Sequence, residues 1–173
     1  MFWKNNTTKE IEKGLKTLFP RLWRYCFILS GSSERADDIA QASCLRALEK
    51  AHQYRPNTDL DRWLFRIAKN IWLNELRSEA VRDLGGMASI DEIDIPDYAP
   101  GPQSSLLNKE LLMGVMELPE AQRMIVALVY IEGYSYAEAA ENLDIPVGTV
   151  MSRLSAARLK LAKKFKHYQR NAV

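Results

Sequence analysis

The stretch "SYAEAAENLDIPVGTVMSRL", residues 135–154, has the pattern of two short helices joined by a tight turn. Ser135, followed three residues later by Glu138, forms a capping box that marks the start of the first helix. The second helix begins near Pro146, because proline is tolerated in the first turn of a helix. Its apolar residues repeat at helical spacing and predict one buried stripe: Val150, Leu154, Ala157, Leu161 and Phe165. This pattern is typical of a helix-turn-helix.

The opposite face of the second helix carries small residues, which are Gly148, Ser152, Ser155 and Ala156, with Thr149 and Met151 on its flanks. Small side chains allow a helix to lie deep in the major groove of DNA with its N-terminus toward the phosphates. No acidic residue follows Asp144, and basic residues from Arg158 onward would contact neighbouring phosphates. An ordinary helical hairpin with a basic tail would give a similar pattern.

The composition of the chain is that of a soluble globular protein, with 173 residues, 47% apolar residues and 27% charged residues. No apolar run is long enough for a membrane span, and the N-terminus lacks a signal-peptide core, so we expect a cytoplasmic protein without membrane insertion. Cys26 and Cys44 lie outside any CxxC motif, and His52 and His167 are isolated. We therefore expect reduced cysteines packed in helices, with no metal site and no cofactor.

The net charge of +2 conceals an uneven distribution along the chain. Residues 1–78 contain 14 Lys and Arg against 9 Asp and Glu, residues 79–118 contain 2 against 8, and residues 119–173 contain 8 against 5. Two basic ends around an acidic middle indicate two modules that face a polyanion and are joined by a linker. Solvated helix faces can produce the same charge runs, so charge alone does not decide the function.

Turn signals divide the rest of the chain into helices. "SGSS" at 30–33 ends a first helix, and Ser32 or Ser33 caps a second one that reaches about Ala51. "YRPNTD" at 54–59 forms a loop, with Thr58 or Asp59 as the cap of a long helix from Leu60 to about Ser78. The apolar spacing predicts these core residues in the first two helices: Ile11, Leu15, Leu18, Leu22, Cys26, Ile39, Leu45 and Leu48.

The fold class that follows is all-α. Residues 85–105 contain paired glycines and three prolines without helical periodicity, which predicts an extended linker. Helical patterns resume at about 106–118, 119–131, 136–143 and 147–165. The sequence thus predicts two small helical domains, residues 1–80 and 106–173, joined by an acidic flexible linker, residues 81–105, with the helix-turn-helix in the second domain.

The long helix "LDRWLFRIAKNIWLNELRS" carries a second set of DNA-binding chemistry. Its spacing predicts that Leu60, Leu64, Ile67 and Ile71 face the core. Another face then carries Arg62, Arg66, Lys69, Asn70, Asn74 and Arg77, with Trp63, Phe65 and Trp72 close by and Tyr54, Arg55 and Asn57 in the loop before it. Cations bind phosphates, amides read base edges and aromatic rings receive unstacked bases, so this set suits opened DNA. In the alternative interpretation, Trp63 and Trp72 are core residues and the arginines are solvated.

Two long segments together resemble the extracytoplasmic-function (group IV) class of bacterial RNA polymerase sigma factors. "ADDIAQASCLRALEKAHQYRPNTDLDRWLFRIAKNIWLNELR" resembles the second region of that family, and "LPEAQRMIVALVYIEGYSYAEAAENLDIPVGTVMSRLSAARLKL" resembles its fourth region. The resemblance covers nearly the whole chain apart from the termini and the linker. It implies a protein that binds core RNA polymerase, recognises the −10 and −35 elements of promoter DNA and starts transcription, under the control of an anti-sigma factor.

The resemblance also assigns roles to residues, none of them catalytic, because the chemistry belongs to polymerase. The residues that it implies for core polymerase binding are Asp37, Asp38, Gln41 and Arg46. Those implied for melting and reading the −10 element are Tyr54, Arg55, Asn57, Arg62, Trp63, Arg66, Lys69, Asn70 and Asn74, where the position of Asn70 lies beside a flipped base. Those implied for the −35 element are Ser135, Thr149, Met151, Ser152, Arg153, Ser155 and Arg158. The linker would thread the polymerase channels, and no small-molecule substrate or enzymatic activity is expected.

The chain departs from the family pattern at four positions. The family often has a basic residue at the position of Met151 and an arginine at that of Ala156, so bidentate guanine contacts from these positions are impossible here. Ala42 replaces a usual acid and Cys44 a usual aromatic residue in the docking helix. Two other functions remain open: a sigma-like decoy that binds an anti-sigma factor without starting transcription, and a simple dimeric repressor.

Overall fold

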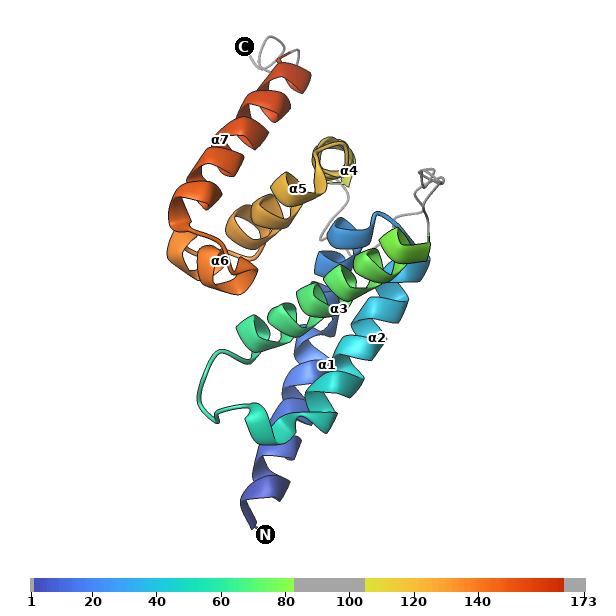
Figure 1. The fold of residues 1–173 in the computed structure, drawn as a ribbon, viewed down its shortest axis with the longest axis vertical. Helices are drawn as coiled ribbons and strands as arrows, with labels where there is room; N and C mark the ends of the chain where they lie inside the picture. Colours follow the sequence, from blue (N-terminus) through green and yellow to red (C-terminus); the bar gives the residue numbers. More distant parts are fainter. Residues whose placement is uncertain (1, 83–104, 167–173) are drawn as a thin grey trace. The chain divides into compact units, whose positions relative to one another are not determined.

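The computed structural model describes residues 2–82 and 105–166 (Figure 1). Both parts of the chain are built from helices, as the sequence patterns predict. The predicted all-α class is confirmed, since 84% of the structure is helical and no strand occurs within the described ranges. Contacts group the chain into two units, Met1–Ile95 and Pro96–Val173. Most of the expected linker, residues 81–105, lies outside the described residues. No helix in the described ranges is long and apolar enough to cross a membrane.

The first unit is built from three helices that all contact one another: α1 (Phe2–Ser30), α2 (Ser33–Glu49) and α3 (Leu60–Arg82). Figure 1 shows them in blue, cyan and green, with α3 lying along α1 and α2. A short 3₁₀ turn, η1 (Ala51–Gln53), follows α2 and leads into the loop that precedes α3. The order of helix, short turn and helix brings α2 and α3 side by side.

The junction between α1 and α2 follows the turn chemistry of the sequence. Gly31 has a φ of +75°, a conformation that suits glycine after a helix, and its N–H donates to the carbonyl of Phe27 at 2.8 Å. Ser32 caps α2, because its hydroxyl accepts a hydrogen bond from the backbone N–H of Arg35 at 3.4 Å. Of the two predicted caps, Ser32 is therefore the one that is used.

The core of the first unit contains most of the predicted α1 stripe. Ile11, Leu15, Leu22 and Cys26 are buried, while Leu18 is half-buried. Tyr25 of this helix stacks on a ring of α3. Leu45 of α2 was expected in the core, but 61% of its surface is exposed. The helix buries Ile39, as predicted, and otherwise packs through small residues, namely Ala36, Ala40, Ser43 and Ala47.

The rotation of α3 about its axis differs from the sequence prediction. The buried stripe consists of residues at positions i, i+3, i+4 and i+7, which are Phe65, Ala68, Lys69 and Trp72, and Leu64 is buried beside it. The rings of Phe65 and Tyr25 stack at 5.0 Å. Because the aromatic rings bury more apolar surface than the isoleucines, they occupy the core side. Ile67 and Ile71, predicted as core, are half-buried, and Lys69, predicted on the DNA-facing side, is only 1% exposed.

The second unit consists of α4 (Ser105–Met116), α5 (Glu120–Val126), the π-helical turn η2 (Ala127–Ile131), α6 (Tyr136–Leu143) and α7 (Val147–Lys164). The bounds of α6 are those predicted. The segment predicted as one helix from 119 to 131 ends in the π-helical turn η2. Gly133 follows with a φ of +74°, as expected for the residue after a helix.

Helix α7 contacts the three other helices of the second unit, α4, α5 and α6. Val150, Leu154 and Ala157 are buried, as the sequence predicts, and α7 contacts both α5 and α6. At its end, the ring of Phe165 lies against Gly114 of α4, where an added Cβ would be 2.7 Å from two ring carbons. Glycine is thus required at position 114 for the close approach of α4 and α7.

We predict that Gly114→Ala destabilises the protein, because the new methyl group overlaps the ring of Phe165. The overlap costs about 1–3 kcal/mol, which exceeds the gain of up to about 1 kcal/mol in helix propensity. Gly148→Ala is a matched control, since no heavy atom lies within 4 Å of its added Cβ. Urea unfolding followed by circular dichroism should show a lower stability for the first variant alone. Equal stabilities of the two variants would contradict this account of the contact.

Candidate nucleic-acid interface

The outward face of α2 presents three of the four residues expected to bind polymerase. Asp37, Asp38 and Gln41 are exposed, and Leu45 continues the same face one turn further on. A carboxylate oxygen of Asp37 accepts a hydrogen bond from the indole N–H of Trp23 at 2.6 Å, which fixes its orientation. The face therefore combines acidic groups with an exposed apolar side chain.

Arg46, the fourth of these residues, lies elsewhere, in a groove between α2 and α3. The groove has a volume of about 400 Å³ and combines three cations, two amides and three aliphatic side chains. Ile67 and Ile71 contribute to its apolar lining. A guanidinium nitrogen of Arg77 donates to the side-chain oxygen of Asn74 at 3.1 Å. The residues that line the groove are Arg46, Lys50, Ile67, Asn70, Ile71, Leu73, Asn74 and Arg77.

The groove therefore brings together two residues of the predicted −10 set, Asn70 and Asn74, both of which are exposed. It also contains two cations, Arg46 and Lys50, that the sequence analysis did not group with the −10 residues. Arg46 was grouped with the docking residues, and Lys50 was not singled out. Their spacing of four residues on one helix is the signal that could have joined them, because such residues share a face.

The loop before α3 is held by Tyr54. Its ring is buried beside the ring of Trp63, with 5.2 Å between the centroids, and its hydroxyl donates to the carbonyl of Thr58 at 2.7 Å. Burial raises the pKa of this hydroxyl above its usual value. Asn57 at the loop tip is exposed with a φ of +63°, and Arg55 is also exposed. Tyr54 thus shapes the loop, while Arg55 and Asn57 face solvent.

Three further residues of the predicted −10 set are half-buried on the first turns of α3: Arg62, Trp63 and Arg66. Arg62 pairs with Asp59 of the loop, at 3.3 Å between nitrogen and oxygen. Lys69 does not join them, because it is buried in the α3 stripe described above. Lys69 therefore does not contribute to the exposed surface of α3 that the sequence predicts to face DNA.

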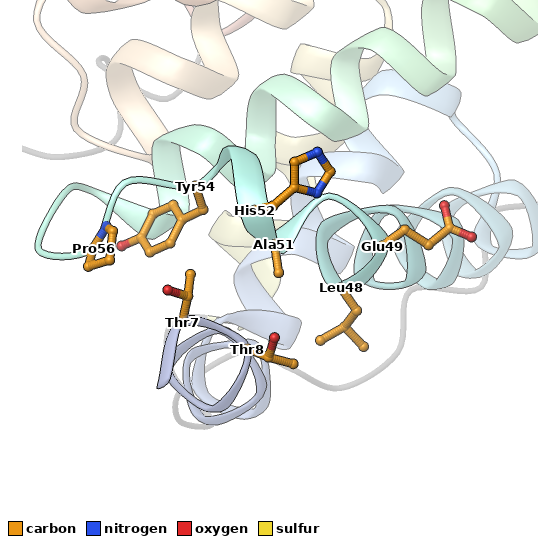
Figure 2. A pocket seen from close by; sticks show the side chains of 8 residues that line it. All are labelled: Thr7, Thr8, Leu48, Glu49, Ala51, His52, Tyr54 and Pro56. Atoms are coloured by element: carbon orange, nitrogen blue, oxygen red, sulfur yellow. The ribbon is translucent and has the colours of Figure 1, made fainter. Parts of the chain in front are cut away.

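A second hollow of about 440 Å³ lies on the other side of Tyr54, between the start of α1, the end of α2 and the loop. Figure 2 shows Thr7 and Thr8 of α1 on one side, with Tyr54 and Pro56 of the loop near them and His52 above. Sequence analysis did not single out these threonines. Among the described residues, no group of three or more His, Cys, Asp or Glu side chains could hold a metal ion, here or elsewhere.

An ionic cluster joins the start of α2 to the end of α3. Arg35 pairs with Glu79, and its guanidinium carbon lies 4.9 Å from the centre of the Trp72 ring. Glu75 lies in the same cluster. Burial raises the pKa of its carboxyl, Arg35 lowers it, and the charges of Glu79 and Asp38 raise it again. The cluster thus concentrates carboxylates beside the predicted docking face.

The helix-turn-helix of the second unit has the predicted cap. The hydroxyl of Ser135 accepts from the backbone N–H of Glu138 at 3.2 Å, and the Glu138 carboxylate accepts from the Ser135 N–H at 2.8 Å. Asp144 makes the turn with a φ of +54°. Of the residues expected at the −35 element, Ser135, Met151, Ser152, Ser155 and Arg158 are exposed, and Thr149 and Arg153 are half-buried.

Comparisons with known proteins match both units. The family model for Sigma-70 region 2 matches residues 15–82, and that for Sigma-70, region 4 matches residues 108–161. The ECF RNA polymerase sigma factor EcfG of Rhodopseudomonas palustris is 32% identical over 157 residues, which cover 90% of this chain and 84% of that protein. The chain belongs to the extracytoplasmic-function (ECF) family of sigma factors. Members of this family are DNA-binding regulators of transcription rather than enzymes.

Other known proteins are similar to this chain over most of their length. SigW of Bacillus subtilis is 27% identical over 91% of this chain and 94% of that protein. The sigma factor RpoE of Bartonella quintana, solved in complex with the anti-sigma factor NepR, has a TM-score of 0.78 and 26% identity, covering 91% of this chain and 98% of that one. CnrH, solved with the cytosolic domain of CnrY, shares the fold with a TM-score of 0.64 at 18% identity.

The raised pKa of Glu75 predicts a pH-dependent effect of Glu75→Gln on the stability of this sigma factor. Because the folded state favours the protonated carboxyl, ionisation destabilises it above the folded pKa, and this cost disappears below the ordinary value of 4.5. Glu75→Gln should therefore raise the free energy of unfolding at pH 7 and lose this advantage as the pH falls toward 4.5. Urea unfolding at several pH values measures the difference. An advantage that is the same at all pH values would instead reflect packing or helix propensity.

Proposed function

We propose that this ECF sigma factor binds core RNA polymerase, recognises both promoter elements and starts transcription in the cytoplasm. The observation that carries the proposal is the groove between α2 and α3, because it combines exposed amides with cations on an apolar lining. Such a groove suits a strand whose bases have left the duplex. Amides can pair with a base edge, aliphatic side chains can contact its face, and cations can bind the phosphates.

In this proposal, Asn70 and Asn74 contact a base of the opened −10 element. Extrusion of a base from the duplex costs a few kcal/mol, which contacts within a shaped groove can repay. Arg62, Arg66 and Arg77 would bind the backbone of the same strand, and Arg46 and Lys50 would do so from α2. Arg46 is thus proposed to contact DNA rather than polymerase, while Asp37, Asp38 and Gln41 keep the proposed docking role.

The second unit would bind the −35 element as a duplex. Helix α7 begins with the exposed residues Val147 and Gly148, and four residues in its second half are basic, namely Arg158, Lys160, Lys163 and Lys164. The exposed residues Ser152 and Ser155 are small enough to let the helix enter the major groove. Basic side chains further along α7 would bind phosphates on either side of the groove.

Control by an anti-sigma factor is the regulatory part of the proposal. Its support is the similar sigma factor of Bartonella quintana, which was solved in complex with an anti-sigma factor. Run-off transcription with core polymerase on promoters mapped after overexpression would test initiation. Stable binding of an anti-sigma factor together with failure to bind core polymerase would favour the decoy function. A footprint on duplex DNA without opened bases would favour a simple repressor.

We predict that Asn70→Ala impairs promoter melting more than the initial binding of polymerase to duplex DNA, because its amide would act only on an unpaired base. Permanganate footprinting of the holoenzyme on a cognate promoter measures melting, and filter binding on ice measures duplex binding. Gln41→Ala is the matched amide control on the docking face, and it should weaken polymerase binding instead. Unchanged permanganate reactivity with Asn70→Ala would refute the role of this residue.

A second prediction concerns phosphate contacts of α7. Lys160→Ala should weaken duplex binding almost equally for all sequences and lower the slope of log affinity against log salt by about one or less. Lys160 is exposed on α7, whereas Lys164 already pairs with Glu117, which directly follows α4. Lys13→Ala on α1 removes the same charge from an exposed position in the other unit and should leave the slope unchanged. A loss confined to one DNA sequence would contradict the phosphate role.

A further inference from the structure

The first turns of α7 expose two apolar side chains on one face. Val147 is 42% exposed and Met151 is 53% exposed, and they lie one helical turn apart. The core side of the helix is already filled by Val150 and Leu154. Single exposed apolar residues are common on protein surfaces, so the meaning of this pair depends on its surroundings.

The surroundings of the pair permit a close approach of another molecule. Gly148 lies beside Val147, and no heavy atom occurs within 4 Å of the position that a Cβ would take there. Ser155, one turn after Met151, is small and exposed. Nothing on this part of the helix would keep its backbone away from the floor of a DNA groove.

The same face lacks the groups that read guanine. A guanine is read by a bidentate arginine or lysine, yet the first charged side chain in this stripe is Arg158, about three turns after Val147. Arg153 lies on another side of the helix and is half-buried. The hydroxyl of Ser152 donates to the carbonyl of Thr149 at 3.1 Å, so its hydrogen is engaged within the helix.

We propose that Val147 and Met151 contact the C5-methyl groups of thymines in the major groove and thereby select A·T pairs in the −35 element. The methyl group of thymine is the apolar group that the major groove presents, and apolar side chains are its usual partners. This inference rests on the proposed function, in which α7 enters the groove. It names the chemistry by which this surface distinguishes one sequence from another.

The test replaces thymine by deoxyuridine, which removes the methyl group and keeps the base pair. Duplexes are first enriched from a randomised library with the full-length chain, and each thymine of the enriched site is then replaced singly. Burial of one methyl group corresponds to roughly fourfold in affinity, so one or two replacements should weaken binding by about that factor. Met151→Ala should abolish the difference at one of these positions, whereas Met151→Leu should retain it.

Leu159→Ala is the matched control for this test. Leu159 is an exposed apolar residue of the same helix, but it lies two turns after Met151, beyond the N-terminal turns that contact base edges in helix-turn-helix proteins. The Leu159→Ala variant should keep the parent protein's ratio of affinities for duplexes that contain thymine and duplexes that contain deoxyuridine. Circular dichroism of each variant checks that the helix is intact.

The outcomes separate this inference from the proposed function. Equal affinity for thymine and deoxyuridine at every position, with salt-dependent duplex binding retained, would overturn the inference alone. Enriched duplexes that contain no thymine would also overturn it. Absence of salt-dependent duplex binding would overturn the proposed function of α7 and the inference together.

Discussion

The burial of Phe65 and Trp72 sets the rotation of helix α3, and the chemistry of the first unit depends on that rotation. Phe65 stacks on Tyr25 of α1, and Trp72 lies under Arg35 of α2. Each residue advances by about 100° around a helix, so Asn70 and Asn74 must face away from this core. Lys69 lies four residues after Phe65 and three before Trp72, on the same stripe of the helix, which is why it is buried.

Burial of apolar residues also sets the rotation of α7, but it exposes a different kind of surface there. Burial of Val150 and Leu154 turns Val147 and Met151 outward, and the neighbouring exposed residues Gly148, Ser152 and Ser155 are small. The groove on α3 therefore offers amides and cations, whereas the start of α7 offers methyl and methylene groups. The first set suits a base that has left the duplex, and the second suits the outer edge of paired bases.

Local signals in the sequence were sufficient for most of the helices and for the caps at Ser32 and Ser135, because these depend on neighbouring residues. The capping box at Ser135 and the bounds of α6 follow from such signals. The sequence prediction was wrong where the packing of two helices decides which residues are buried. Leu45 was expected inside, but the close packing of α2 uses alanines such as Ala36 and Ala40, which periodicity of large residues does not reveal. The groove that Arg46 lines was not predicted for a related reason, since a groove depends on the position of a second helix.

Weak base reading by α7 has a consequence for the chain as a whole. One methyl contact changes affinity by roughly fourfold, far less than a bidentate arginine on guanine achieves. In the proposed function, the sequence selectivity of the second unit would therefore be low, and phosphate contacts would supply most of its affinity without choosing a sequence. A second DNA-binding surface on the same chain would raise this selectivity. Once one surface is bound, binding of the other becomes intramolecular, and the sequence preferences of the two surfaces multiply. In the proposed function, a helix with so little polar reading chemistry would act together with a second DNA-reading surface, and the groove between α2 and α3 would be that surface.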